Sequence, residues 1–148
     1  MLLAKSSVGF LTAVLFSSIL ASRTFGADKE TNGVPSFRNQ VQPILAKFGC
    51  SAGACHGAAA GQNGFKLSLR GYDDEGDYIA LTRHALGRRI IPSDPGRSLM
   101  LLKPTGAVPH KGAKKFDTES LEYKILSDWI ASGAPGPKKD DPRIQRIE

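Results

Sequence analysis

The feature that most limits what this chain can fold into is the segment Cys50-Ser-Ala-Gly-Ala-Cys55-His56. It holds both cysteines of the 148-residue chain, and a histidine directly follows the second one. In an oxidising compartment this pattern has three chemical interpretations: a local disulfide, a metal site, or thioether bonds to a haem. The residues around the segment have to decide between them.

Haem attachment needs two thiols that reach two vinyl groups on one edge of the porphyrin, and a histidine that meets the iron. The usual motif is Cys-x-x-Cys-His. Here the Cys55-His56 adjacency is kept, but four residues separate the cysteines instead of two. The four are small, and Gly53 permits backbone angles that a bulged loop requires.

The local segment also allows other chemistry. A Cys50–Cys55 disulfide would suit a small loop in an exported protein. Zinc would need two ligands besides the thiolates, for which His56 with His84 or His110 are the candidates. A thioredoxin-like site is disfavoured because no βαβ pattern surrounds the cysteines.

The N-terminus predicts export. Lys5 precedes an apolar run from Val8 to Leu20, and small residues follow up to Ala27. A basic start, a short apolar core and a small-residue end are typical of a secretory signal peptide, here residues 1–27. The run is too short to cross a bilayer comfortably, so we expect no stable membrane span after cleavage. An uncleaved N-terminal anchor is the alternative interpretation.

The net charge and its distribution along the chain bear on whether it binds nucleic acid. The whole chain carries 20 basic and 14 acidic residues. Removal of residues 1–27 takes away Lys5 and Arg23 and no acid, which leaves 18 basic residues and a formal charge of +4. Because both signs are interspersed, we expect no nucleic-acid partner.

Apolar spacing predicts a small all-α domain over residues 36–135, after a linker at 28–35 and before a solvated tail at 136–148. Four helical segments are expected. The first follows Ser36 and runs to Gly49, with an interruption at Pro43; the others cover 75–86, 94–104 and about 117–133. Residues 65–70 alternate apolar with polar, which predicts at most a short extended segment. The long connections between these helices need a surface to pack on, which a haem would supply.

Three runs of residues together resemble a known family. The first runs from Phe37 through Pro43-Ile-Leu to Cys55-His56-Gly57, and it resembles the haem-binding region of class I c-type cytochromes. Ile91-Pro-Ser-Asp-Pro95 with Ser98-Leu-Met-Leu101, and Trp129-Ile-Ala-Ser-Gly-Ala134, are similar to segments of the planctomycete-type cytochrome c domain. The resemblance spans about residues 36–135 and implies a cytochrome c-like fold wrapped around one covalent haem c.

Residues 50–57 followed by Gly61-Gln-Asn-Gly-Phe-Lys-Leu-Ser-Leu69 resemble one branch of that family more closely. In that branch the domain lies at the N-terminus of large exported proteins, ahead of immunoglobulin-like and uncharacterised domains. The present sequence ends at Glu148, where members of the branch normally continue. It is therefore interpreted as a free-standing cytochrome, a truncated product or a piece of a larger protein.

The resemblance makes His56 one axial ligand of the iron and leaves the other to be identified. The wider family uses a Met-Pro methionine before the terminal helix, but this chain reads Val108-Pro109-His110-Lys111-Gly112 at that place. We therefore expect His110 as the distal ligand. Met100 is the alternative, although a methionine inside an apolar helix is more often core filler. Paired histidines predict a lower reduction potential than a His/Met pair.

Other residues give weaker indications. Arg88 and Arg89 are candidates to pair with haem propionates, or are solvated loop cations. Trp129 is expected to pack, either on the macrocycle or as an anchor of the last helix. His84 is expected to be a surface or capping residue.

The expected function is electron transfer by an exported haem module, periplasmic or at the cell surface, with a redox protein as partner and no enzymatic activity of its own. Two alternatives remain at this stage. One is a haem-bearing accessory domain of a larger redox enzyme. The other is a haem-free exported binding module closed by a Cys50–Cys55 disulfide.

Overall fold

The computed structural model describes residues 33–57 and 60–142. Helical turns and loops make up this part of the chain, which contains no strand apart from an isolated bridge between Gln62 and Phe65. The prediction of a small all-α domain is therefore confirmed. The predicted signal peptide, residues 1–27, and most of the predicted linker lie outside the described residues.

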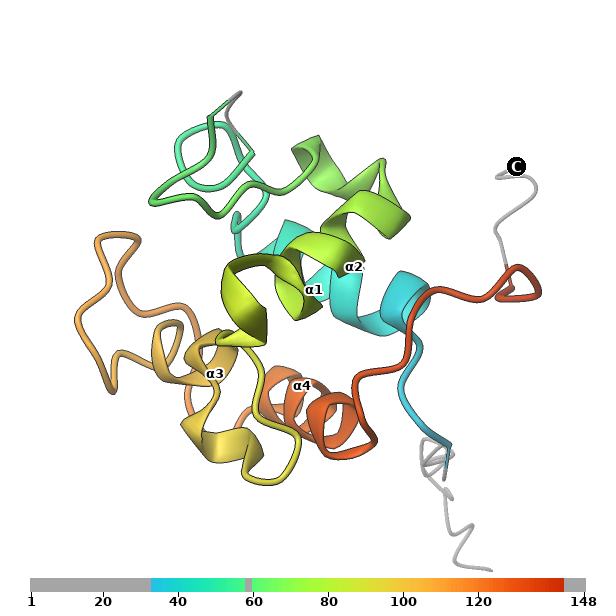
Figure 1. Cartoon of the computed structure of the whole chain (residues 1–148). Helices are drawn as coiled ribbons and strands as arrows, with labels where there is room; N and C mark the ends of the chain where they lie inside the picture. Colours follow the sequence, from blue (N-terminus) through green and yellow to red (C-terminus); the bar gives the residue numbers. More distant parts are fainter. Residues whose placement is uncertain (1–32, 58–59, 143–148) are drawn as a thin grey trace, which may run out of the picture. The chain divides into compact units, whose positions relative to one another are not determined.

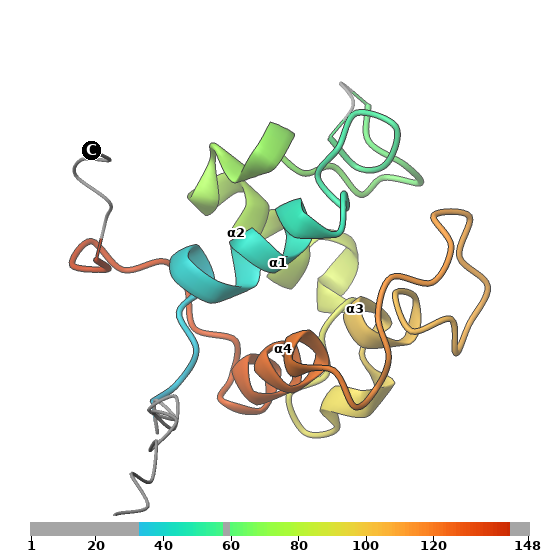
Figure 2. The same cartoon turned by 180° about the vertical axis from the view of Figure 1, so that it is seen from behind.

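The described residues contain four α-helices: α1 (Gln42–Lys47), α2 (Asp74–Thr82), α3 (Leu99–Leu102) and α4 (Leu121–Ala131). A π-helical turn, Phe37–Val41, leads into α1, and 3₁₀ turns lie at Leu69–Gly71, His84–Gly87 and Pro95–Arg97. Figures 1 and 2 show that the loop after α1 and the loop between α3 and α4 extend on the same side of these helices. None of the helices in residues 33–57 and 60–142 has the length and apolar character needed to cross a membrane.

The first helix begins as predicted. The Ser36 hydroxyl accepts a hydrogen bond from the Asn39 amide at 3.2 Å, which caps the π-helical turn. Phe37 and Val41 are buried on its inner face. Pro43 lies near the start of α1, where its missing amide donor costs least. The interruption expected at Pro43 corresponds to the change from π-helical to α-helical hydrogen bonding.

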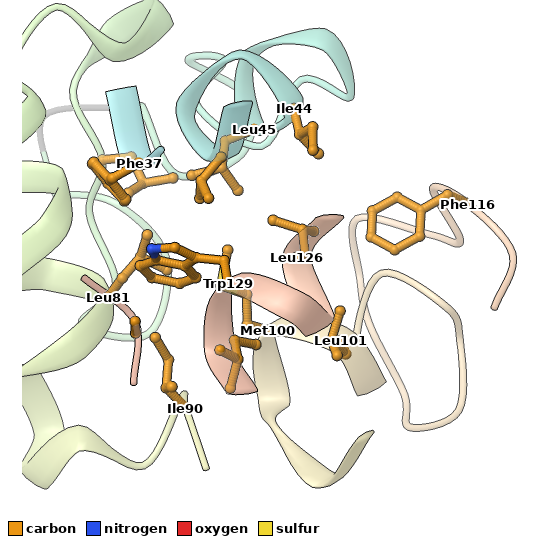
Figure 3. Close-up of a cluster of buried hydrophobic side chains, with 14 residues drawn as sticks. Phe37, Ile44, Leu45, Leu81, Ile90, Met100, Leu101, Phe116, Leu126 and Trp129 are labelled. Carbon is orange, nitrogen blue, oxygen red and sulfur yellow. The ribbon is translucent and has the colours of Figure 1, made fainter. Parts of the chain in front are cut away.

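Trp129 lies at the centre of the core. Its side chain is fully buried, and its Nε1 donates to the Pro135 carbonyl at 2.9 Å. The ring centroids of Trp129 and Phe37 are 5.6 Å apart. Figure 3 shows the indole among Phe37, Leu81 and the other apolar side chains of the cluster. Trp129 therefore anchors α4 to the first helix, one of the two packing roles expected for it.

The last helix begins later than predicted and ends where predicted. Its N-cap is Ser120, whose hydroxyl accepts from the Tyr123 amide at 3.1 Å, so Asp117 and Thr118 stay outside α4. At the other end Gly133 has φ +85° and its amide donates to the Ile130 carbonyl at 3.0 Å. This is the left-handed glycine stop that the sequence predicted.

Two predicted helices are shorter than expected. The helix predicted over 75–86 ends at Thr82, because Ala85 and Leu86 adopt left-handed φ angles of 54° and 59°. The segment predicted as one helix over 94–104 is a 3₁₀ turn followed by α3. Ser98 separates the two, and its hydroxyl accepts from the Ile91 amide at 2.9 Å.

Residues 65–70 do not form a strand. Instead a buried carboxylate fixes the segment against the helices: Asp77 on α2 accepts from the Ser68 amide at 2.5 Å and from the Ser68 hydroxyl at 2.8 Å. Gln42 on α1 donates to the same carboxylate at 3.1 Å. The extended segment predicted over 65–70 is only partly present: Ser68 has extended backbone angles, but Leu69–Gly71 form a 3₁₀ turn and Arg70 has a φ of 54°.

The beginning of the predicted solvated tail is held to the domain. Asp141 accepts from the Ser36 hydroxyl at 3.1 Å, and one of its carboxylate oxygens lies 3.6 Å from a guanidinium nitrogen of Arg38. Arg38 also donates to the Lys138 carbonyl. The structured part of the chain thus extends beyond residue 135 to at least Asp141, and residues 143–148 lie outside the described part.

Candidate functional site

The Cys50–His56 segment forms a compact loop closed by its own backbone. The Cys55 amide donates to the Ala52 carbonyl at 2.9 Å, and the His56 amide donates to the Cys50 carbonyl at 2.9 Å. The Cys50 amide reaches back to the Leu45 carbonyl at 2.8 Å, which ties the loop to α1. The four small residues between the cysteines therefore form a bulge that is closed by backbone hydrogen bonds.

The position of Gly57, at the end of this loop, has no room for a side chain. A Cβ at this position would lie 2.1 Å from the Ser51 carbonyl oxygen and 2.9 Å from a methyl carbon of Leu69. No other residue fits there without a shift of backbone. The glycine after Cys55-His56 is thus required by the bulged loop itself.

The two cysteines and two of the three histidines line one cavity of about 460 Å³. This volume is in the range of small-molecule and cofactor sites. Both thiols are free in the structure. The apolar part of the lining includes Leu45, Phe65, Leu81, Leu99, Met100 and Pro104.

His56 is held so that one ring nitrogen stays available. Its Nδ1 lies 3.0 Å from the Phe65 carbonyl oxygen, which can only accept, so Nδ1 carries the proton and Nε2 keeps its lone pair. The Phe65 ring packs on the imidazole with centroids 4.5 Å apart. Burial lowers the pKa of His56 below its ordinary value; the Phe65 carbonyl opposes this, and nearby cationic groups add to the lowering. The neutral imidazole is the form that binds a metal.

His110 is arranged in the same way from the opposite loop. Its Nδ1 lies 3.1 Å from the Ala113 carbonyl oxygen, so Nδ1 donates there and this bond does not use Nε2. Gly112 gives the ring room, because a Cβ there would be 2.8 Å from Cε1 of His110. The imidazole planes of His56 and His110 differ by only 6°, and their centroids are 6.5 Å apart.

The other candidate ligands are placed differently. Met100 lines the same cavity but belongs to the buried core, with 7% of its surface exposed. His84 is exposed and does not line the cavity, as expected for a surface residue. Trp129 does not line it either, so of its two expected roles the structure gives it the core one.

The cavity is cationic. Its lining includes five basic side chains, Arg88, Arg89, Lys103, Lys111 and Lys115, and no aspartate or glutamate. Burial raises the pKa of the Cys50 thiol, and the charge of Lys115 opposes this rise. Such a lining suits a ligand that is largely apolar and bears negative groups at an edge.

Arg89 is not a solvated loop cation, which was one of the two roles predicted for it. Only 6% of its surface is exposed, and its guanidinium lies over the Phe65 ring with Cζ 4.5 Å from the centroid. Neither this contact nor the Phe65 and Ala113 carbonyl acceptors was predicted from the sequence. Backbone acceptors leave no signature in a sequence, and the Arg89–Phe65 contact joins residues far apart in the chain.

The thiols and imidazoles do not assemble into a conventional zinc site. Within the described residues no group of three or more His, Cys, Asp or Glu side chains is placed to hold a metal ion. A haem iron differs in needing only two axial ligands from the protein, since the porphyrin supplies the rest. The donor set of this cavity, two thiols and two imidazoles in an apolar and cationic lining, therefore fits a covalently held haem better than zinc.

No protein-family model matches the chain, and no characterised protein or solved structure is significantly similar to it. The function is therefore inferred from the residues of the cavity.

Proposed function

We propose that this chain binds one haem c covalently and acts as an exported electron-transfer module of the planctomycete-type cytochrome c kind. One observation carries the proposal: two loops far apart in the sequence bring Cys50, Cys55, His56 and His110 to a single cavity. These are the four residues that the sequence analysis selected for thioether formation and axial ligation.

The thioethers would come from Cys50 and Cys55. Both thiols are free, and both line the cavity. The hydrogen bonds within the bulged loop hold the two cysteines in a fixed relation despite the four-residue spacing. His56 follows Cys55 directly, so the same loop supplies the first axial ligand.

His110 is the preferred second ligand. Two imidazoles bound to opposite sides of one metal ion, each through a bond of about 2 Å, would have ring centroids roughly 6 Å apart. The observed 6.5 Å agrees with this requirement, and both Nδ1 atoms are already engaged by carbonyl oxygens. Hydrogen bonds of this kind orient ligating histidines in metal sites. Met100 is less suitable because its side chain belongs to the buried core.

The remaining chemistry of the cavity supports a haem. Bound haem would supply a one-electron iron couple, and two histidine ligands would give it a lower potential than a His/Met pair. The apolar lining would shield part of a bound macrocycle from water, and the basic side chains other than Arg89 would offer partners for its propionates. With both thiols in thioethers and both imidazoles on the iron, none of these four side chains would be free to act as a nucleophile or base, so the proposed role is electron transfer to a protein partner.

Expression with residues 1–27 in a host that matures c-type cytochromes tests the proposal. The chain purified from the exported fraction should be red and low-spin, and its pyridine haemochrome should have the absorption maximum of a haem with two saturated vinyl groups. A folded, colourless protein in which Cys50 and Cys55 are oxidised to each other would instead identify a haem-free binding module. A purified variant with both cysteines changed to alanine is the control for haem that binds without thioethers.

A further inference from the structure

A buried arginine, Arg89, lines the cavity on the same side as His56 and Phe65 and is held by backbone carbonyls. The Nη1 atom of Arg89 donates to the carbonyls of Ala80 at 3.1 Å and His84 at 2.9 Å, and its Nη2 donates to the Gly64 carbonyl at 3.3 Å. No carboxylate pairs with this guanidinium in the part of the chain that the structure describes. Its partners are therefore backbone oxygens and one aromatic ring.

The end of α2 accounts for the burial of this charge. Ala80 lies in the last turn of α2 and His84 just beyond it, where carbonyl oxygens have no partner within the helix. A cation is stabilised at this negative end of the helix dipole. The planar guanidinium also bonds two segments at once, which a lysine ammonium does less well. Arg89 thus joins the end of α2 to the loop that contains Gly64.

Phe65 connects Arg89 to His56. The Arg89 guanidinium lies over the Phe65 ring at 4.5 Å, and the Phe65 ring in turn contacts the His56 imidazole, with centroids 4.5 Å apart. The Phe65 carbonyl also accepts from Nδ1 of His56. Phe65 therefore holds the imidazole through both its ring and its backbone. Arg89 holds Phe65 through the ring and through the carbonyl of the preceding residue.

We propose that Arg89 is a positioning residue: it fixes Phe65, and Phe65 fixes the rotation of the His56 ring so that this ring stays parallel to that of His110. The inference rests on the proposed function, because the angle between the two rings has a consequence only when both bind one iron. In that case the angle decides the shape of the ferric low-spin electron paramagnetic resonance spectrum. Nearly parallel imidazoles give three well-separated features, whereas crossed imidazoles give one feature at very low field.

The test uses the haem-loaded full chain and its Arg89→Met and Phe65→Leu variants. The unmodified protein should give the spectrum of parallel imidazoles. Both variants should retain covalent haem and lose this spectrum in favour of a crossed or mixed one, and the double variant should not differ from either single variant. Arg83→Met is the matched control, because Arg83 is an exposed cation at the same end of α2 and does not line the cavity. It should leave the spectrum unchanged.

Arg89→Lys separates stacking from charge. It keeps the cation but lacks the planar fork, so it should lose the parallel spectrum as Arg89→Met does. An unchanged spectrum in Arg89→Met and Phe65→Leu overturns the inference while leaving the proposed function intact. A wild-type spectrum in Arg89→Lys overturns the stacking role.

If the unmodified chain carries no haem, the proposed function fails separately, and ¹⁵N shifts of His56 in the haem-free chain decide the inference. A single Nδ1-protonated tautomer that becomes a mixture in Arg89→Met supports it. Equal tautomer populations in the two proteins overturn it.

Discussion

The imidazole rings of His56 and His110 lie within 6° of parallel, and their centroids are 6.5 Å apart. This separation is too wide for the two rings to stack in direct contact. In each ring the Nδ1 atom is engaged by a carbonyl oxygen. The two rings come from loops more than fifty residues apart and line one cavity. We propose that this pair provides the two axial ligands of one haem iron.

Removal of the distal imidazole should change the spin state. In the haem-loaded protein, His110→Ala should convert a low-spin absorption spectrum to a high-spin one, because the iron loses its sixth ligand. The comparison is Met100→Leu, a volume-conserving change in the core that should leave the spectrum low-spin. High-spin iron in Met100→Leu together with low-spin iron in His110→Ala would make Met100 the ligand.

The two cysteines should contribute one thioether each. Cys50→Ala and Cys55→Ala should each yield haem that stays with the chain on a denaturing gel, with a haemochrome maximum shifted to that of one remaining vinyl group. If the Cys50→Ala maximum equals that of the unmodified protein, Cys50 forms no thioether and the four-residue spacing prevents the second bond.

Gly57→Ala should destabilise the loop that carries His56. Its Cβ would meet the Ser51 backbone at 2.1 Å, and overpacking of this kind costs about 1–3 kcal/mol. Gly53→Ala is the matched control in the same loop, because a Cβ there has no neighbour within 4 Å. Urea unfolding should give a lower midpoint for Gly57→Ala and a nearly unchanged one for Gly53→Ala. Equal midpoints would mean that the loop is not closed as described.

The carboxylate of Asp77 should contribute to stability although no cation pairs with it in the described residues. Asp77→Ala leaves the Ser68 amide, the Ser68 hydroxyl and Gln42 without their shared acceptor, and we expect a loss of roughly 2–4 kcal/mol in the free energy of unfolding. Asp128→Ala removes only an exposed i,i+4 pair with Lys124 and should cost less than about 1 kcal/mol. Comparable losses in the two variants would contradict the role given to Asp77.

Much of the fold was predictable because apolar spacing and capping residues are local. Ser36, Gly133 and the apolar stripe containing Trp129 fixed the first and last helices to within a few residues. The early end of α2 was not predictable, because the left-handed φ angles that follow it belong to Ala85 and Leu86. Neither is a glycine, the residue type that usually signals such angles in a sequence.

Part of the candidate site was also predictable from the sequence, and part was not. Cys50, Cys55, His56 and His110 were selected from motif order, and the structure brings them to one cavity. The Arg89–Phe65–His56 contacts were missed, because a stacked guanidinium and a carbonyl acceptor depend on packing between segments that are distant in the chain.

Intact-mass and peptide-fragment mass spectrometry of the exported, denatured protein test the central claim most directly. The account predicts a chain heavier by one haem, with the added mass located on the peptide that contains Cys50, Cys55 and His56. A chain with no added mass, and a disulfide within that peptide, would contradict it.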